Sequence, residues 1–185
     1  MKVSERSVAA LPLASLIACA RCILDQPKGF TPNQGRLMKL TEIQQITHLP
    51  AEVLTLEKEA VAEGFRFLTR LISEWHSGTN RFNAPGECLM AAYSNQQVIG
   101  IGGLTVDPYN KPDTARLRRV YVAPAARHQH VGQALVNALV AHATLHFQKV
   151  RLSTDTSGGD AFYLRCGFSR TEDVHATHIM ELVNA

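Results

Sequence analysis

The sequence has few cysteines and few aromatic residues. Its 185 residues include four cysteines and one tryptophan, and only 6% are aromatic. Neither an internal repeat nor a low-complexity tract occurs. Because 45% of the residues are hydrophobic and 19% charged, a disordered chain, a collagen-like fibre and a disulfide scaffold are excluded. A globular domain with a continuous core remains.

The net charge of +3 does not call for a nucleic-acid partner. Such a charge suits an anionic small molecule as well as a polymer. The arginines at 116, 118 and 119 lack the interleaved aromatic residues of a single-strand binding surface. We therefore expect no nucleic-acid partner.

Cysteine and histidine spacings predict no metal site. Cys19 and Cys22 form a lone CxxC without a second pair, so reduced thiols are expected rather than structural zinc. His142 and His146 would share one face of a helix, but no glutamate follows His142 as in the zinc-peptidase motif. We expect no metal cofactor.

Residues 1–37 form an N-terminal extension that differs from the rest of the chain. Lys2 and Arg6 precede a short apolar run that ends at Cys19. This pattern is typical of a secretory signal, and residues 16–19 resemble a lipobox. The run is too short to span a bilayer as a helix. The extension is therefore an export signal, an amphipathic helix packed on the body, a disordered segment, or a stretch upstream of a true start at Met38.

Residues 38–185 predict one α/β domain. The order of elements puts three strands in antiparallel series and then a parallel pair joined by a right-handed crossover helix. We expect a mixed antiparallel and parallel sheet with helices on both faces. Gly64 would divide the first helical region, and the glycines at 100, 102 and 103 indicate a bulge or a close backbone approach. Strands are predicted at 38–46, 88–93, 97–106, 114–122, 150–154 and 174–182, and helices within 51–76, 127–146 and 161–166.

The segment 117–135 is the candidate binding segment. In it, a predicted strand runs through a short loop directly into a helix. The first N–H groups of a helix have no partner within it and carry the positive end of its dipole, so phosphate oxygens bind there. Arg127 would add a charge, and Gly132 would let a ligand approach the backbone. On these residues alone, an ordinary strand-to-helix turn with a solvated arginine is equally open.

The rest of the pattern resembles a known family. Arg127-His-Gln-His130-Val-Gly132 resembles motif A, Q/R-x-x-G-x-G/A, of the GNAT superfamily of acyl-CoA-dependent N-acyltransferases. Phe162-Tyr-Leu-Arg-Cys-Gly-Phe168 resembles its motif B at the expected distance. The similarity in element order covers roughly Met38 to the C-terminus. One residue departs from the pattern: His130 replaces the first motif glycine, where an imidazole could crowd the diphosphate or, when protonated, add a contact to it.

The resemblance implies a GNAT-like fold and transfer of an acetyl group from acetyl-CoA, the cosubstrate, to a primary amine by direct attack. The acceptor would be a small molecule or a peptide amine; a homodimer is left open. A cytoplasmic location without membrane contact follows from the cytosolic cosubstrate, unless residues 1–19 are a lipoprotein signal. The implied CoA-binding residues are Val120, Tyr121, Val122, Arg127, His128, Gln129, His130, Val131, Gly132 and Gln133.

The same resemblance implies how catalysis would work. The strands at 114–122 and 150–154 would splay apart, so that the pantetheine arm pairs with the free edge near Val120 and Val122. The Val122 N–H would polarise the thioester carbonyl, and Tyr163 would protonate the departing thiolate. The acidic residue that some family members carry on the strand at 114–122 is missing here. Asp107, Glu74 and Asp155 are candidates for the base because we expect them near the cleft, and a water chain is the alternative.

Two other functions remain open from the sequence. One is a non-catalytic module that senses acyl-CoA, with His130 marking a decayed site. The other is an exported, lipid-anchored interaction domain, which only residues 1–19 favour.

Overall fold

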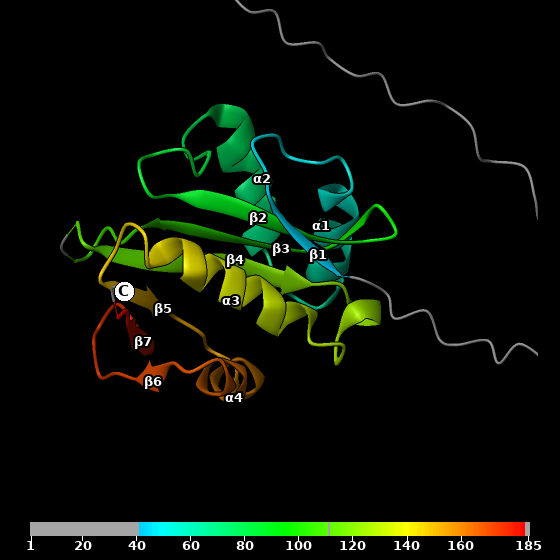
Figure 1. Cartoon of the computed structure of the whole chain (residues 1–185). Helices are drawn as coiled ribbons and strands as arrows, with labels where there is room; N and C mark the ends of the chain where they lie inside the picture. The colour runs from blue at the N-terminus through cyan, green and yellow to red at the C-terminus, as the bar shows by residue number, and fades with distance from the viewer. Residues whose placement is uncertain (1–40, 111, 184–185) are drawn as a thin grey trace, which may run out of the picture. The chain divides into compact units, whose positions relative to one another are not determined.

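The computed structural model describes residues 41–110 and 112–183. The interpretations of the N-terminal extension, and the boundary between residues 37 and 38, lie outside the described residues. Within them the chain forms a seven-stranded mixed sheet with helices on both faces, so the predicted fold class is confirmed (Figure 1).

The strand order across the sheet is β1-β2-β3-β4-β5-β7-β6. Neighbours from β1 to β4 are antiparallel, β4 and β5 are parallel, and β5, β7 and β6 are again antiparallel. The strands are β1 (Glu42–Gln45), β2 (Cys88–Ser94), β3 (Gln97–Val106), β4 (Thr114–Val122), β5 (Lys149–Leu152), β6 (Ser169–Arg170) and β7 (His178–Glu181). The helices are α1 (Val53–Ala62), α2 (Phe67–Ser77), α3 (Val131–Ala143), α4 (Ser157–Arg165) and the short 3-10 helix η1 (Pro124–Ala126).

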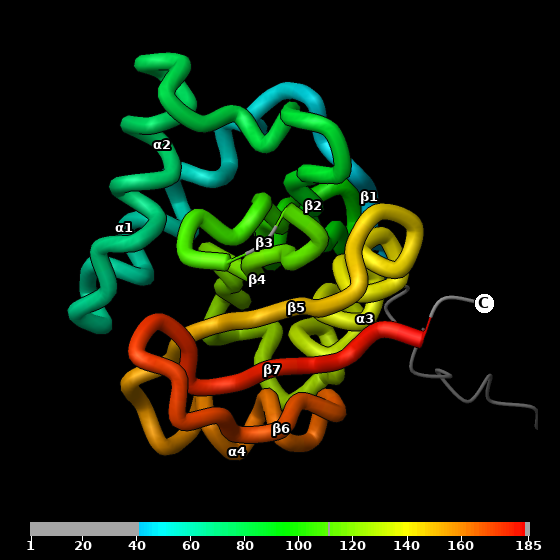
Figure 2. The backbone as a smooth tube through the Cα atoms, turned by 90° about the vertical axis from the view of Figure 1, so that its left-hand side faces the viewer, coloured from blue at the N-terminus to red at the C-terminus, as the bar shows by residue number. Residues whose placement is uncertain are grey.

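The helices bury two separate cores against the sheet. Helices α1 and α2 lie on one face, where Leu56 and Leu71 pack with Ile101 of β3. On the other face Leu135 and Leu139 of α3 pack with Leu117 of β4. Figure 2 shows α1 and α2 on one side of the central strands and α3 on the other. Each face carries its own apolar side chains, because successive residues of a strand point to opposite faces.

A β-bulge interrupts β4. The pairing with β3 shifts between Gly103↔Arg118 and Ile101↔Tyr121, and Arg119 has a left-handed backbone with φ 60°. The extra residue reverses the alternation, so Leu117 joins the α3 core and Tyr121 the α1–α2 core. The bulge that the glycines of β3 predicted is therefore present. The close approach is present too, because a Cβ at Gly103 would lie 2.2 Å from a ring carbon of Phe82.

Several predicted boundaries are wrong. Helix α3 begins at Val131 rather than near Arg127, because His128 and His130 have left-handed φ values of 60° and 59°. Helix α4 begins at Ser157 rather than Ala161, because the Thr156 side chain caps it by accepting the Gly159 N–H at 3.1 Å. Strand β6 was not predicted, and strand β7 is shorter than predicted.

Candidate active site

The sheet opens between β4 and β5. The two strands pair only over Thr114–Arg116 and Lys149–Arg151, while β4 continues to Val122. The predicted splaying is therefore present. A cavity of about 1460 Å³ lies along the open part, lined by β4, the β4–α3 connection, residues 153–156, α4 and the α1–α2 connection. Residues 64–67 and Arg70, at the junction of α1 and α2, thus shape the cavity. The described residues of the loop 107–112 do not line it.

The free edge of β4 presents the Val122 amide. The Ala123 N–H donates to the Ile99 carbonyl at 2.9 Å, so Ala123 is hydrogen-bonded to β3. Because neighbouring residues of a strand direct their amides to opposite edges, the Val122 N–H and C=O point to the open side. The carbonyl accepts the Arg127 Nε–H at 3.1 Å. The position expected of an oxyanion donor is therefore at the cavity edge.

The start of α3 presents unpaired amides to the same cavity. Among the described residues, no acceptor takes a hydrogen bond from the backbone N–H groups of residues 128–133. The first paired amide is that of Ala134, which donates to the His130 carbonyl at 2.9 Å. No acidic side chain lies in the first turn. This is the electrostatic arrangement of an anion site at a helix N-terminus.

All but one of the predicted CoA-binding residues line the cavity. The exception is Gln129, whose side-chain amide instead donates to the Ala125 carbonyl at 2.9 Å, although its backbone N–H is free. The residues in place are Val120, Tyr121, Val122, Arg127, His128, His130, Val131, Gly132 and Gln133.

Arg127 is neutralised by a partner that the sequence did not indicate. Its Nη1 and Nη2 donate to the two carboxylate oxygens of Glu63 at 2.8 and 2.6 Å. This pairing lowers the pKa of Glu63 and raises that of Arg127. Tyr121 completes the cluster, since its hydroxyl donates to Glu63 at 3.2 Å; burial, followed by the charge of Glu63, raises its pKa to about 12. Arg127 therefore fastens the loop to the end of α1, and Glu63 balances the charge that Arg127 adds there.

Tyr163 lies on α4 and lines the cavity. Its ring contacts those of Phe162, Phe168 and His178, with centroids 5.0, 5.8 and 6.0 Å away. Burial, with a smaller contribution from Cys166, raises the pKa of Tyr163 above its ordinary value. The hydroxyl therefore stays protonated at neutral pH, as a proton donor must.

Of the three candidate bases, only Asp155 is in place. Asp107 is 2% exposed, ion-paired with Arg151 at 3.3 Å, and absent from the cavity lining. Glu74 accepts two hydrogen bonds from Arg119 at 3.0 and 2.9 Å. Asp155 is exposed and is the sole carboxylate among the described residues that line the cavity.

Gly132 lies where α3, α4 and the edge of β4 meet. A Cβ there would lie 3.3 Å from Cζ of Phe162 and 3.6 Å from Cγ2 of Val122. The larger side chain of Gly132→Val must push the start of α3 away from the cavity, since overpacking costs ~1–3 kcal/mol. We expect the Kd for CoA, measured by calorimetry, to rise about tenfold or more.

The matched control for this variant is Ala134→Val, because Ala134 is exposed on the same helix and does not line the cavity. Its Kd for CoA should stay within about twofold of the wild-type value, well below the tenfold that ~1.4 kcal/mol produces. An unchanged Kd in Gly132→Val would contradict the placement of the ligand loop.

The mixed sheet is split between β4 and β5, and its open strand edge lies beside the unpaired amides at the start of α3. This arrangement fits a domain that binds an extended anionic ligand, and the comparison with known families is consistent with it. Residues 50–168 match the acetyltransferase (GNAT) family. The chain therefore belongs to the GNAT family of acetyltransferases. No curated protein sequence matches it.

Solved structures share the fold. A protein from Exiguobacterium sp. 255-15, assigned as an acetyltransferase, is 26% identical with a TM-score of 0.69, over 76% of this chain and 93% of its own. A GNAT family N-acetyltransferase from Escherichia coli, crystallised in complex with CoA, is 16% identical with a TM-score of 0.58, over 78% of this chain and 82% of its own. The second likeness shows the fold alone.

Membrane-spanning helices and clusters of metal ligands are both absent from the described residues. No helix in the described part of the chain is long and apolar enough to cross a membrane. No group of three or more potential metal-ligating side chains occurs among the same residues.

Proposed function

We propose that this protein transfers an acetyl group from acetyl-CoA to a primary amine. The observation that carries the proposal is the row of unpaired backbone amides at residues 128–133, which opens onto the cavity beside the free edge of β4. Such amides fit a diphosphate, and an open edge fits an extended amide-bearing arm. Family membership supports the same function.

The chain's residues would divide the cosubstrate between them. The amides at the start of α3 would hold the diphosphate, and the Val120–Val122 edge would pair with the pantetheine arm. The bound cosubstrate supplies an activated thioester. The Val122 N–H would donate to its carbonyl oxygen, a contact worth ~2.7–4 kcal/mol in the transition state. A cytoplasmic location accords with this cosubstrate and belongs to the proposal.

The chemistry then needs two proton movements. The amine attacks the thioester carbon as the neutral base, so the C–N bond forms while the C–S bond breaks. Tyr163 gives its proton to the departing thiolate sulfur. Asp155, or water at the mouth of the cavity, takes the proton that the amine nitrogen loses. The phenolate of Tyr163 is reprotonated from solvent before the next turnover.

Release of CoA thiol from acetyl-CoA, with a panel of small and peptide amines, tests the function. We expect amine-dependent thiol release and an acetylated amine of the corresponding mass. Thiol release that no amine accelerates, together with no CoA binding by calorimetry, would contradict the proposal.

The sensor function is the second candidate, and His130 is the observation that favours it. A non-glycine residue in the left-handed conformation is strained by ~1–2 kcal/mol, and His130 holds φ 59° at the first motif glycine. Tight acetyl-CoA binding without turnover on any amine would identify a sensor.

A further inference from the structure

The cavity wall carries far more positive than negative charge. Among the described residues that line it, Asp155 is the single carboxylate. Three of the lining arginines already have carboxylate partners, which are Glu63 for Arg127, Glu74 for Arg119 and Asp107 for Arg116. No such partner occurs among the described residues for the other four, Arg66, Arg70, Arg118 and Arg165.

Arg118 stands out because it is partly buried and unpaired. It lies on β4 between Leu117 and Arg119, and the described part of the chain offers its guanidinium neither an ion pair nor a hydrogen bond. Burial, together with the positive charge of Arg119, lowers its pKa, and the charge of Glu74 opposes this shift only in part. A partly desolvated cation without a carboxylate in direct contact is unfavourable, so a bound anion would be favourable here.

Arg118 lies on β4 at a distance in sequence from the loop that would bind the diphosphate. The strand runs from Arg118 past Val120 and Val122 into the loop at 127–133. A diphosphate on that loop and a thioester near Val122 leave Arg118 beyond the acyl group, where the acceptor must enter. Because Leu117 faces the α3 core, Arg118 faces α1 and α2 instead.

Helix α2 brings two more unpaired arginines to the same side of the cavity. Arg66 precedes the first residue of α2, and Arg70 lies in its first turns. Both line the cavity and are exposed, so neither needs an internal partner. The wall that faces an incoming acceptor is therefore cationic on both β4 and α2.

We propose that the acceptor amine carries a carboxylate or a phosphate group, which Arg118 binds with help from Arg70. The planar guanidinium presents parallel N–H donors that match either group, which fixes the orientation of the acceptor as well as its affinity. This inference rests on the proposed transferase function and deepens it. It adds no step to the chemistry, since the anionic group stays unreacted while the amine attacks.

Matched pairs of amines test the inference in the full chain. The pairs are 4-aminobutyrate with 4-aminobutanamide, for a carboxylate, and phosphoethanolamine with ethanolamine, for a phosphate. With saturating acetyl-CoA, we expect the anionic member of at least one pair to have a kcat/KM about tenfold or more higher. The pair with the larger ratio identifies the group. Turnover of both members of each pair at equal kcat/KM would overturn the inference and leave the transferase function standing.

The Arg118→Gln variant assigns the preference to one residue. It should remove the preference through a rise in the KM of the anionic acceptor, while the KM for acetyl-CoA stays within about twofold, since charge-assisted contacts are local. Arg118→Lys should restore part of the preference, because it keeps the charge and loses the paired donors. Lys58→Gln, exposed on α1 and outside the cavity, removes the same net charge and should change neither constant. A preference that survives Arg118→Gln would overturn the assignment.

A binding readout keeps the test independent of turnover. In the presence of CoA, 4-acetamidobutyrate should raise the thermal midpoint of the wild-type protein, and N-butylacetamide should not. Arg118→Gln should abolish that difference. Equal effects of the two compounds, in a protein that binds CoA, would overturn the inference, whereas failure to bind CoA would overturn the proposed function.

Discussion

Replacing Tyr163 by phenylalanine is expected to lower kcat by about a hundredfold or more, because a positioned general acid contributes ~10²–10⁴-fold. The ring remains, so its contacts with Phe162, Phe168 and His178 are kept. Only the hydroxyl, which is the proposed proton donor to the thiolate, is lost. The KM for acetyl-CoA should change by less than about twofold, since uniform binding is untouched. Steady-state kinetics of thiol release measure both constants.

The pH dependence supplies an independent check on this role. Burial raises the pKa of Tyr163, so the hydroxyl remains protonated through neutral and moderately alkaline pH. The wild-type rate should therefore rise with pH as the amine loses its proton, without a decline from Tyr163 below about pH 10, the ordinary pKa of tyrosine.

Tyr93→Phe is the matched control, because Tyr93 is also partly buried with a raised pKa but does not line the main cavity. Its kcat should stay within about twofold of the wild-type value, as expected of a group outside the reaction. Tyr163→Phe with the wild-type rate across pH would show that another group protonates the thiolate.

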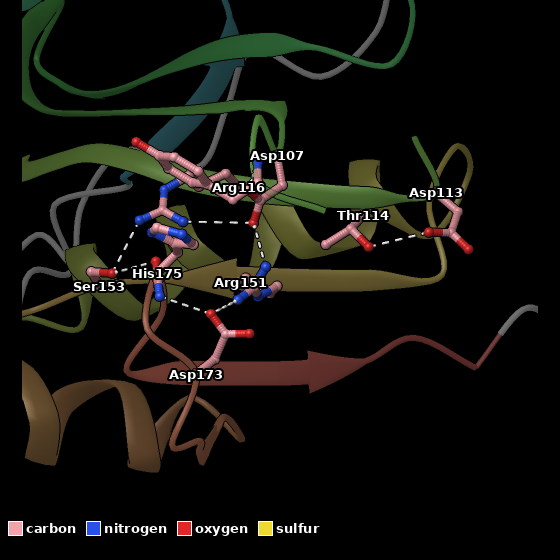
Figure 3. Close-up of polar contacts among 9 residues, drawn as sticks. Asp107, Asp113, Thr114, Arg116, Arg151, Ser153, Asp173 and His175 are labelled. Carbon is pink, nitrogen blue, oxygen red and sulfur yellow. Dashed lines mark hydrogen bonds and ion pairs between the residues drawn. The ribbon is translucent and has the colours of Figure 1, made fainter. Parts of the chain in front are cut away.

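Replacing Asp107 by alanine is expected to lower the free energy of unfolding by about 3–5 kcal/mol, the usual cost of removing one member of a buried ion pair. Asp107 and Arg151 are each 2% exposed. The Asp107 Oδ2 lies 3.3 Å from Nη1 of Arg151 and 3.6 Å from Nη1 of Arg116 (Figure 3). Among the described residues, the variant leaves Arg151 with one carboxylate partner, the partly exposed Asp173. Urea unfolding followed by fluorescence measures the loss.

The ion-pair cluster of Asp107, Arg116 and Arg151 lies where β4 and β5 begin to diverge. Arg116 and Arg151 are partners in the last paired register of the two strands, and the Arg116 Nη2 also donates to Ser153 Oγ at 3.0 Å. Loss of Asp107 should therefore loosen the closed end of the split sheet as well as destabilise the domain.

Glu181→Ala is the control for an exposed pair. Its carboxylate lies 3.1 Å from Nζ of Lys149, but the two side chains are 65% and 38% exposed. The expected loss is below about 1 kcal/mol. If Asp107→Ala lowered the free energy of unfolding by no more than this control does, the ion pairs of Asp107 would not stabilise the sheet.

Most of the fold could be predicted from the sequence, because local residue patterns determine where strands, helices and turns form. The apolar runs at 88–93 and 97–106 indicated β2 and β3, and Gly64 marked the division between α1 and α2, where it adopts φ 87°. The bulge was readable from the glycines of β3, since a side chain at Gly103 has no room beside Phe82. The start of α3 was misplaced because the left-handed histidines at 128 and 130 have no propensity signal.

The ion pairs of the site could not be read in the same way. Glu63 meets Arg127 across 64 positions of sequence, and Asp107 meets Arg151 across 44. Contacts between such distant residues depend on tertiary packing, which no local pattern reports. The same limit applies to the candidate bases, because only the folded chain separates the buried Asp107 and the paired Glu74 from Asp155 at the cavity.

A crystal structure of the full chain with CoA would show where the diphosphate binds. We expect diphosphate oxygens about 3 Å from backbone nitrogens within residues 128–133, with the pantetheine arm along the Val120–Val122 edge. A diphosphate bound elsewhere, with those amide hydrogens donated to the protein's own carbonyl or side-chain oxygens, would contradict this placement.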